Sequence, residues 1–183
     1  FRVSSLDNRI MPPNFFTSYK LQTVEGYDPL YLKNYAEYIV ALERNSPDID
    51  PPFGFNRIIT PHNYESQLFD FLNTKYVLSL DEISSPKLTK IFEEGQTKIY
   101  QNTHAFERAY FVKRVINTKN DINSLFTEDL KVTAVISEEN LNDLGNLSVG
   151  SVKIINYTEN KITIETKNSG NGFMVMSDTY FPT

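Results

Sequence analysis

The sharpest local pattern of chemistry-bearing residues is a pair of aspartates, Asp48 and Asp50, separated by one isoleucine. Two carboxylates at this spacing can hold a divalent cation through their oxygens, as they do in nucleotide-sugar glycosyltransferases. Prolines surround the pair at Pro47, Pro51 and Pro52, and a segment of this composition is typical of a surface loop. Asp-x-Asp also arises by chance in a chain with this aspartate content. The pattern therefore favours a solvated turn over a metal site, and no cofactor is expected.

Histidine and the standard catalytic motifs offer no stronger candidate. His62 follows Pro61 at the start of an expected helix, where it can act as a general base or a ligand. No carboxylate or second histidine is tied to it by spacing, and His104 lies in a polar turn, so we expect neither to be catalytic. The sequence contains no nucleophile elbow, P-loop or dinucleotide-binding glycine motif, and no cysteine. We therefore assign no catalytic residue and no metal ligand.

Aromatic residues are abundant, with 13 phenylalanines and 11 tyrosines. Several gather near the N-terminus beside amide and carboxylate side chains: Phe15, Phe16, Tyr19 and Tyr27 with Asn8, Asn14 and Asp28. A tyrosine in such surroundings can stack on a sugar ring and hydrogen-bond to its hydroxyl groups. The alternative is that these rings belong to the core, as most aromatic side chains do. From this cluster we select four candidate carbohydrate-binding residues: Asn8, Tyr19, Tyr27 and Asp28.

The net charge restricts the partners of the chain. It has 183 residues and a formal net charge of −5, which argues against a nucleic acid. A polyanionic partner would need a local group of cations, for which Arg108, Lys113 and Arg114 are candidates, although strand alternation would place Lys113 opposite Arg114. No run approaches the ~20 apolar residues that span a bilayer. Both ends of the chain are typical of cuts within a longer polypeptide, so we expect an excised domain.

Helices are expected at four places. Three of them should begin where a capping oxygen precedes a proline. These pairs are Asp28-Pro29, Thr60-Pro61 and Ser85-Pro86. An apolar stripe of helical period covers residues 30–43, and shorter stripes follow the second and third pairs, the last ending at Gly95. A fourth helix is expected over residues 120–127.

Runs of β-branched and aromatic residues predict the strands. They cover residues 76–80, 98–100, 109–112, 132–136, 152–155, 162–165 and 173–176. The first of these is the most continuously apolar, so we expect it at the centre of a sheet. The last three are joined by connections too short for crossovers, which predicts an antiparallel meander.

Together these elements predict an α+β fold. Residues 1–116 should form an α+β domain in which helices pack on a mixed sheet. Residues 117–183 should form an antiparallel β-rich portion, part of a sandwich that is truncated at its C-terminus.

The order of several segments resembles the extracytoplasmic C-terminal region of the YfhO-type bacterial membrane proteins. The family pattern runs Gly-Tyr-Asp-Pro-Leu, Leu-Asn-Val-Lys-Tyr-Val-Ile, Tyr-Glu-Asn with Arg-Ala-Phe-Val, and Ser-Asp-Thr-Tyr-Tyr-Pro-Gly-Trp. The corresponding segments here are residues 24–30, 72–78, 98–102, 108–112 and 174–182, and they follow Arg2-Val3-Ser4 and Asn8. The chain departs from the pattern at Thr74, Gln101 and Thr183, and the family's tryptophan lies past its end.

The resemblance implies a domain on the extracytoplasmic face of the cell membrane, attached to a transmembrane portion of the same polypeptide. Such proteins look like multispanning glycosyltransferases that use polyprenyl-phosphate sugars and decorate cell-envelope polymers. In that superfamily the catalytic carboxylate lies in an early loop between membrane helices, and no position here matches it. The resemblance thus implies a non-catalytic domain that positions a glycopolymer acceptor, within a parent protein that is the enzyme.

Two other functions remain open from the residues alone. The chain can be a structural or assembly module without a ligand. It can also be a soluble carbohydrate-active enzyme that uses carboxylates from separate loops, such as the loop of Asp48 and Asp50.

Overall fold

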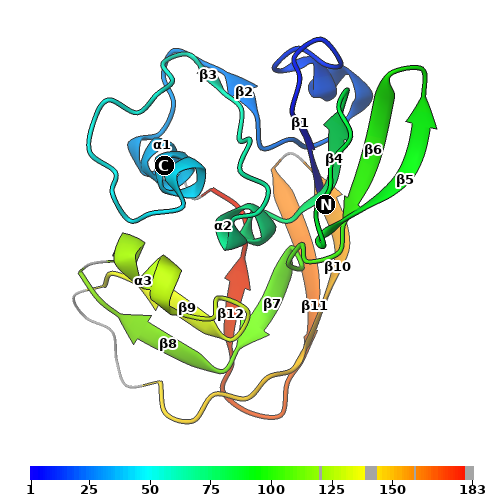
Figure 1. Ribbon diagram of the computed structural model, residues 1–183. Helices are drawn as coiled ribbons and strands as arrows, with labels where there is room; N and C mark the ends of the chain where they lie inside the picture. The colour runs from blue at the N-terminus through cyan, green and yellow to red at the C-terminus, as the bar shows by residue number, and fades with distance from the viewer. Residues whose placement is uncertain (120, 139–143, 159, 180–183) are drawn as a thin grey trace. The chain divides into compact units, whose positions relative to one another are not determined.

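The computed structural model describes residues 1–119, 121–138, 144–158 and 160–179. The chain divides into two compact units, Phe1–Phe106 and Glu107–Thr183. Both combine helices with strands that are mostly antiparallel, which confirms the α+β class (Figure 1). The division lies between residues 106 and 107, whereas the sequence pattern placed it between 116 and 117.

The first unit is built on a four-stranded mixed sheet. Its strands are β1 (Arg2–Ser5), β4 (Thr74–Ser79), β6 (Thr97–Asn102) and β5 (Leu88–Glu94), in that spatial order. β1 runs parallel to β4, and the other two pairs are antiparallel. β4 lies between two partners and Val77 in it is fully buried, which confirms the expected central strand.

Two α-helices accompany this sheet. α1 (Lys33–Arg44) buries the apolar stripe predicted over 30–43, with Ile39, Val40 and Leu42 almost inaccessible to solvent. It begins after Leu32 and not after Asp28. The second helix, α2 (Gln67–Phe71), is shorter than predicted and begins after Ser66, whose hydroxyl accepts a hydrogen bond from the Leu68 N–H. The first two proline pairs therefore lie in the loops that precede these helices and do not cap them.

The third expected helix is wrong, because the segment after Pro86 forms strand β5. The Ser85 hydroxyl does accept a hydrogen bond from the Lys87 N–H at 3.2 Å, but this closes a turn and starts no helix. Three apolar residues at helical spacing are too few to hold a helix when β6 offers ladder partners along the whole segment. Gly95, with φ of +60°, makes the turn between the two strands.

A smaller ribbon completes the first unit. β2 (Gly26–Tyr27) pairs antiparallel with β3 (Ile58–Ile59), and a short 3₁₀ helix, η1 (Phe15–Tyr19), precedes them. The largest fully buried side chains of the unit are Tyr100, Phe16, Phe69, Ile39, Leu42 and Leu68.

The second unit consists mainly of three strand pairs. β7 (Ala109–Val112) pairs antiparallel with β12 (Phe173–Met176), and β10 (Ser151–Thr158) forms a hairpin with β11 (Lys161–Lys167). β8 (Arg114–Asn117) and β9 (Thr133–Ile136) are parallel and are connected through α3 (Asp121–Thr127). This helix matches the expected one, whose first residue, 120, lies outside the described residues.

The expected meander of three strands is wrong at its third member. β12 pairs with β7 and not with β11 (Figure 1). The connection from β11 is short enough for a hairpin, but Phe173 and its neighbours find their partners in a strand far earlier in the sequence. None of the helices within the described ranges is long and apolar enough to cross a membrane.

Candidate functional site

Two of the predicted carbohydrate-binding residues, Tyr27 and Asp28, lie on the short β2–β3 ribbon. Tyr27 stands directly opposite Ile58, so the two side chains share one face of the ribbon. The Asp28 N–H continues the pairing by donating to the Arg57 carbonyl at 3.0 Å. The ribbon is only two ladder pairs long, so additional contacts are needed to hold it.

Asn14 supplies these contacts through its side-chain amide. Asn14 Nδ2 donates to the Tyr27 carbonyl at 2.8 Å, and the Tyr27 N–H donates to Asn14 Oδ1 at 3.1 Å. The amide thus binds the Tyr27 backbone as a neighbouring strand would. Asn14 has φ of 70°, a left-handed conformation that asparagine tolerates better than most residues.

Large apolar side chains are exposed at this place. The exposed fractions are 46% for Tyr27, 87% for Leu30 and 41% for Ile58. We call Asn14, Tyr27, Asp28, Leu30 and Ile58 together the Tyr27 surface. The Leu30 N–H donates to Asp28 Oδ1 at 2.8 Å, which orients the exposed carboxylate of the residue that follows Tyr27 in the chain. An aromatic ring beside a carboxylate can stack on a sugar ring and accept hydrogen bonds from its hydroxyl groups.

The other two predicted residues are exposed but not tied to this surface. Tyr19 lies in η1 with 66% of its area exposed. Asn8 lies in a turn that Asp7 and Arg9 close, with Arg9 Nη2 donating to Asp7 Oδ2 at 2.6 Å. Within the described ranges no hydrogen bond joins Asn8 or Tyr19 to Tyr27. The structure therefore connects Tyr27 and Asp28 with Asn14, a member of the same sequence cluster.

Directly before the Tyr27 surface lies a buried carboxyl group that sequence reasoning missed. Glu25 is 7% exposed, and its Oε1 accepts a short hydrogen bond from the Ser5 N–H. Its Oε2 is buried without a hydrogen-bond partner, as is the neighbouring Ser4 Oγ. Burial raises the pKa of Glu25 to about 7, and this effect outweighs the opposite influence of the Ser5 N–H and the Ser4 and Thr23 hydroxyls. A carboxyl group with a raised pKa thus lies in the segment directly before β2.

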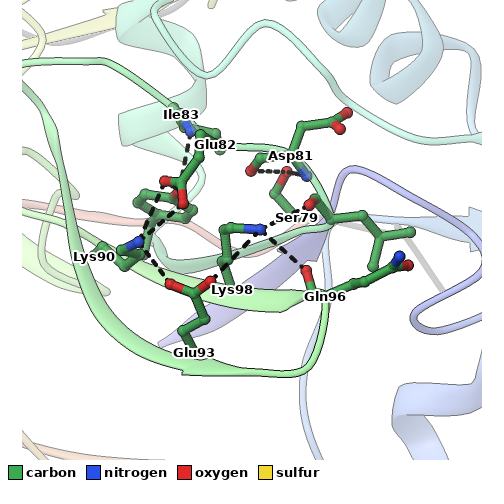
Figure 2. Close-up of polar contacts among 10 residues, drawn as sticks. Ser79, Asp81, Glu82, Ile83, Lys90, Glu93, Gln96 and Lys98 are labelled. Carbon is green, nitrogen blue, oxygen red and sulfur yellow. Dashed lines mark hydrogen bonds and ion pairs between the residues drawn. The ribbon is translucent and has the colours of Figure 1, made fainter.

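The most extensive surface network of the first unit lies on the β5–β6 hairpin and the loop that precedes it (Figure 2). Lys90 Nζ lies 3.0 Å from Glu82 Oε1 and 2.7 Å from Glu93 Oε2. Tyr100 Oη donates to Glu82 Oε2 at 3.0 Å and accepts from the Ile83 N–H at 2.9 Å. The hydrogen bond from Lys90 is the main reason that the pKa of Glu82 is lowered. These groups are hydrogen-bonded and ion-paired to one another, so the network holds the loop to the hairpin.

The loop of Asp48 and Asp50 is organised by Arg44. Arg44 Nη1 lies 3.3 Å from Asp48 Oδ1, and its guanidinium donates to the carbonyls of Asp48, Asp50 and Pro52. Asp48 Oδ1 also accepts from the Asp50 N–H at 3.0 Å. Within the described ranges no three His, Asp or Glu side chains are placed to hold a metal ion. This geometry is that of a structured turn.

His62 has a carboxylate neighbour that its sequence spacing does not reveal. Its Nδ1 lies 3.9 Å from Glu43 Oε2, and its backbone N–H donates to Glu43 Oε1 at 2.6 Å. The same Oε1 accepts from the Asn63 N–H, and Asn63 Nδ2 donates to the Leu42 carbonyl. Glu43 and Asn63 thus join the end of α1 to the loop that precedes α2. The His62 side chain is exposed beside Glu43.

In the second unit, both arginines of the proposed cationic group are paired with a carboxylate. Arg108 is 7% exposed and binds Asp178 through a short ion pair, while its Nη2 donates to Tyr157 Oη at 2.9 Å. Arg114 binds Glu128 through a short ion pair and donates to Thr133 Oγ1 at 2.8 Å. Arg108 is buried in its ion pair, whereas the Arg114 side chain is 58% exposed.

No family model, curated protein or solved structure matches the chain. The function therefore has to be inferred from the geometry of the described residues. The Tyr27 surface combines exposed apolar area with an oriented polar group.

Four other polar residues in the segments compared with the YfhO-type pattern make internal bonds. Asn73 Nδ2 donates to the Phe106 carbonyl at 2.6 Å, and Asn102 Nδ2 donates to Asp70 Oδ1 at 2.8 Å. Arg108 and Asp178, also in these segments, form the ion pair described above. Their role in the described structure is to join strands and loops.

Proposed function

We propose that this chain is an extracytoplasmic, non-catalytic domain of a bacterial membrane protein that resembles a lipid-linked-sugar glycosyltransferase. Its task is to position a cell-envelope glycopolymer acceptor for the membrane-embedded active site. Its partners are the transmembrane portion of the same polypeptide and that polymer.

The observation that carries this proposal is the exposure of the Gly26–Leu30 segment. This segment belongs to the pattern that resembles the YfhO-type proteins, yet its large side chains do not serve the core: Tyr27 is 46% and Leu30 is 87% exposed. Exposed apolar side chains of this size usually indicate a contact surface when they gather in one place. The oriented carboxylate of Asp28 adds the polar contact that a hydroxyl-rich ligand requires.

A ligand titration tests the proposal. The isotope-labelled 183-residue chain is titrated with a sugar-bearing polyol-phosphate oligomer, and the amide signals are followed. We expect shifts confined to residues 14, 26–30 and 56–58. Tyr27→Ala should weaken binding roughly tenfold, because an aromatic contact of this kind contributes about 1–2 kcal/mol. Phe92→Ala, which removes another half-exposed ring on β5, serves as the matched control and should leave binding unchanged.

A module without a ligand is the second candidate. The internal bonds of Asn73, Asn102 and Arg108 favour it, because they explain these matched residues by stability alone. In this case the titration gives no shifts, and Tyr27→Ala affects neither binding nor the transferase activity of the full-length protein.

A further inference from the structure

Glu25 anchors the segment that leads into the Tyr27 surface. Residues 22–25 run along β1, where the Val3 N–H donates to the Gln22 carbonyl at 2.9 Å and the Val24 N–H donates to the Val3 carbonyl at 3.4 Å. The Ser5 N–H then donates to Glu25 Oε1, so the last contact of this run is made by a side chain. Tyr27 follows only two residues later, on β2.

The surroundings of Glu25 suit its protonated form. Oε2 has no hydrogen-bond partner, and no ion pair to Glu25 is formed by the described residues. A protonated carboxyl group can donate from Oε2 to the neighbouring Ser4 Oγ while Oε1 still accepts from the Ser5 N–H. The ionised group would instead leave a negative charge in a site that excludes water, which costs free energy.

The ionisable groups around this site lie on β1 and α1. Arg2 of β1 donates from Nη1 to the Leu72 carbonyl at 2.8 Å. Tyr35 of α1 donates to the Val24 carbonyl at 2.6 Å, and burial raises its pKa to about 12, so it remains neutral at physiological pH. The charges of Arg2 and Glu25 both influence Tyr35, which places all three groups in one neighbourhood. Tyr35 holds Val24 by a bond that does not depend on pH in this range.

We propose that Glu25 is a pH-sensitive switch whose ionisation loosens residues 22–25 from β1 and thereby releases the Tyr27 surface. At low pH the protonated side chain joins this segment to Ser5. At higher pH the ionised carboxylate is more stable in water than in its buried site. To reach water, the segment has to move away from β1. The inference concerns the fold of the first unit and does not depend on which ligand, if any, the surface binds.

Hydrogen exchange of backbone amides provides the test. The protection factors of Ser5 and of residues 22–27 are compared between pH 5.5 and 8.5, after correction for the chemical exchange rate. For a carboxyl group with pKa near 7 when buried and 4.5 when exposed, opening should increase roughly 30-fold over this range. Amides of β4 and β6 serve as internal references and should show no comparable change.

Two variants make the result specific to Glu25. Glu25→Gln keeps an oxygen that accepts from the Ser5 N–H but cannot ionise, so its protection should not depend on pH. Glu94→Gln removes an exposed glutamate of β5 and should behave like the wild type. Protection that does not change with pH in the wild type, or that falls equally in Glu25→Gln, would overturn the proposal.

A direct titration covers the case in which Glu25→Gln fails to fold. The carboxyl carbon of Glu25 is followed by NMR in the wild-type chain. A midpoint near pH 7 supports the switch, and a midpoint near the ordinary value of 4.5 refutes it.

Discussion

Lys87 Nζ lies 2.7 Å from Asp70 Oδ2, and the two side chains are only 10% and 8% exposed. The ammonium group also donates to the carbonyls of Tyr64, Glu65 and Ser66 at 3.0, 3.1 and 3.3 Å. Asp70 in turn accepts from Asn102 Nδ2 through its other oxygen. The pair therefore connects the start of β5, helix α2 and the end of β6 within the first unit.

Removing one partner of this pair should destabilise the chain strongly. Lys87→Met leaves the Asp70 carboxylate buried without its cation, so we expect a loss of about 3–5 kcal/mol in the free energy of unfolding. The measurement is chemical denaturation of the wild type and the variant. The double variant Lys87→Met/Asp70→Leu removes both charges and should be more stable than the single variant. An equal or larger loss in the double variant would show that the unpaired charge of Asp70 is not the cause of the destabilisation.

The ion pair of Arg108 should tolerate lysine poorly. Its guanidinium binds Asp178 and donates to Tyr157 Oη, and it lies over the Tyr157 ring at 5.4 Å. A lysine keeps the charge but cannot make these contacts together. We expect Arg108→Lys to lower the free energy of unfolding by about 2 kcal/mol. Lys113→Arg, a change at an exposed neighbour, is the control and should have no measurable effect.

The stability of the chain should decrease between pH 5 and pH 8 because of Glu25. Its pKa is about 7 in the folded chain and 4.5 in the unfolded chain. The folded state therefore holds a proton that the unfolded state has lost, and the resulting stabilisation disappears as the pH rises through 7. For this group alone we expect a loss of about 2.5 kcal/mol, measured by denaturation at several pH values. The slope should be absent from Glu25→Gln, and an unchanged slope would assign the effect to other groups.

Asn14 should be more sensitive to alanine than an exposed residue normally is. Asn14→Ala removes both hydrogen bonds to the Tyr27 backbone and places a less tolerant residue at φ of 70°. We expect a loss of about 1–3 kcal/mol and faster exchange of the Tyr27 amide. Asn14→Gly accepts the backbone conformation but also lacks the amide, so the difference between the two variants separates strain from hydrogen bonding.

The two lysines of the network in Figure 2 should behave differently. Lys98 is 8% exposed and donates to the carbonyls of Leu80 and Gln96. Its replacement by methionine removes both hydrogen bonds of a buried ammonium group and should cost about 2 kcal/mol. Lys90→Met removes ion pairs that solvent already weakens, so its effect should be smaller and should fade at high salt. Parallel denaturation at low and high ionic strength compares them.

The sequence predicted the elements whose signal is local. The apolar stripe of α1 and the apolar run of β4 each reflect one face or one strand that must be buried, and both are found close to the expected bounds. The segment after Pro86 was misread because Leu88, Ile91 and Phe92 have helical spacing. The segment forms a strand because it pairs with β6, and the residues of β6 lie outside the segment from which the helix was predicted.

The candidate site could be predicted only in part, for a similar reason. Tyr27, Asp28 and Asn14 belong to one sequence cluster because they are close along the chain. Glu25 gave no signal, because its burial depends on β1, which lies about twenty residues away in sequence. The pairing of Arg108 with Asp178 likewise depends on β7 and the end of β12, which meet only in the folded chain.

The amide of Asn14 also has a consequence for self-association. A short ribbon such as β2–β3 would otherwise offer the N–H and C=O of Tyr27 as a template for a strand from another molecule. Because Asn14 already occupies both groups, this edge is closed to intermolecular β-pairing while the Tyr27 ring stays accessible. The same side chain thus blocks edge pairing at Tyr27 and leaves its ring exposed.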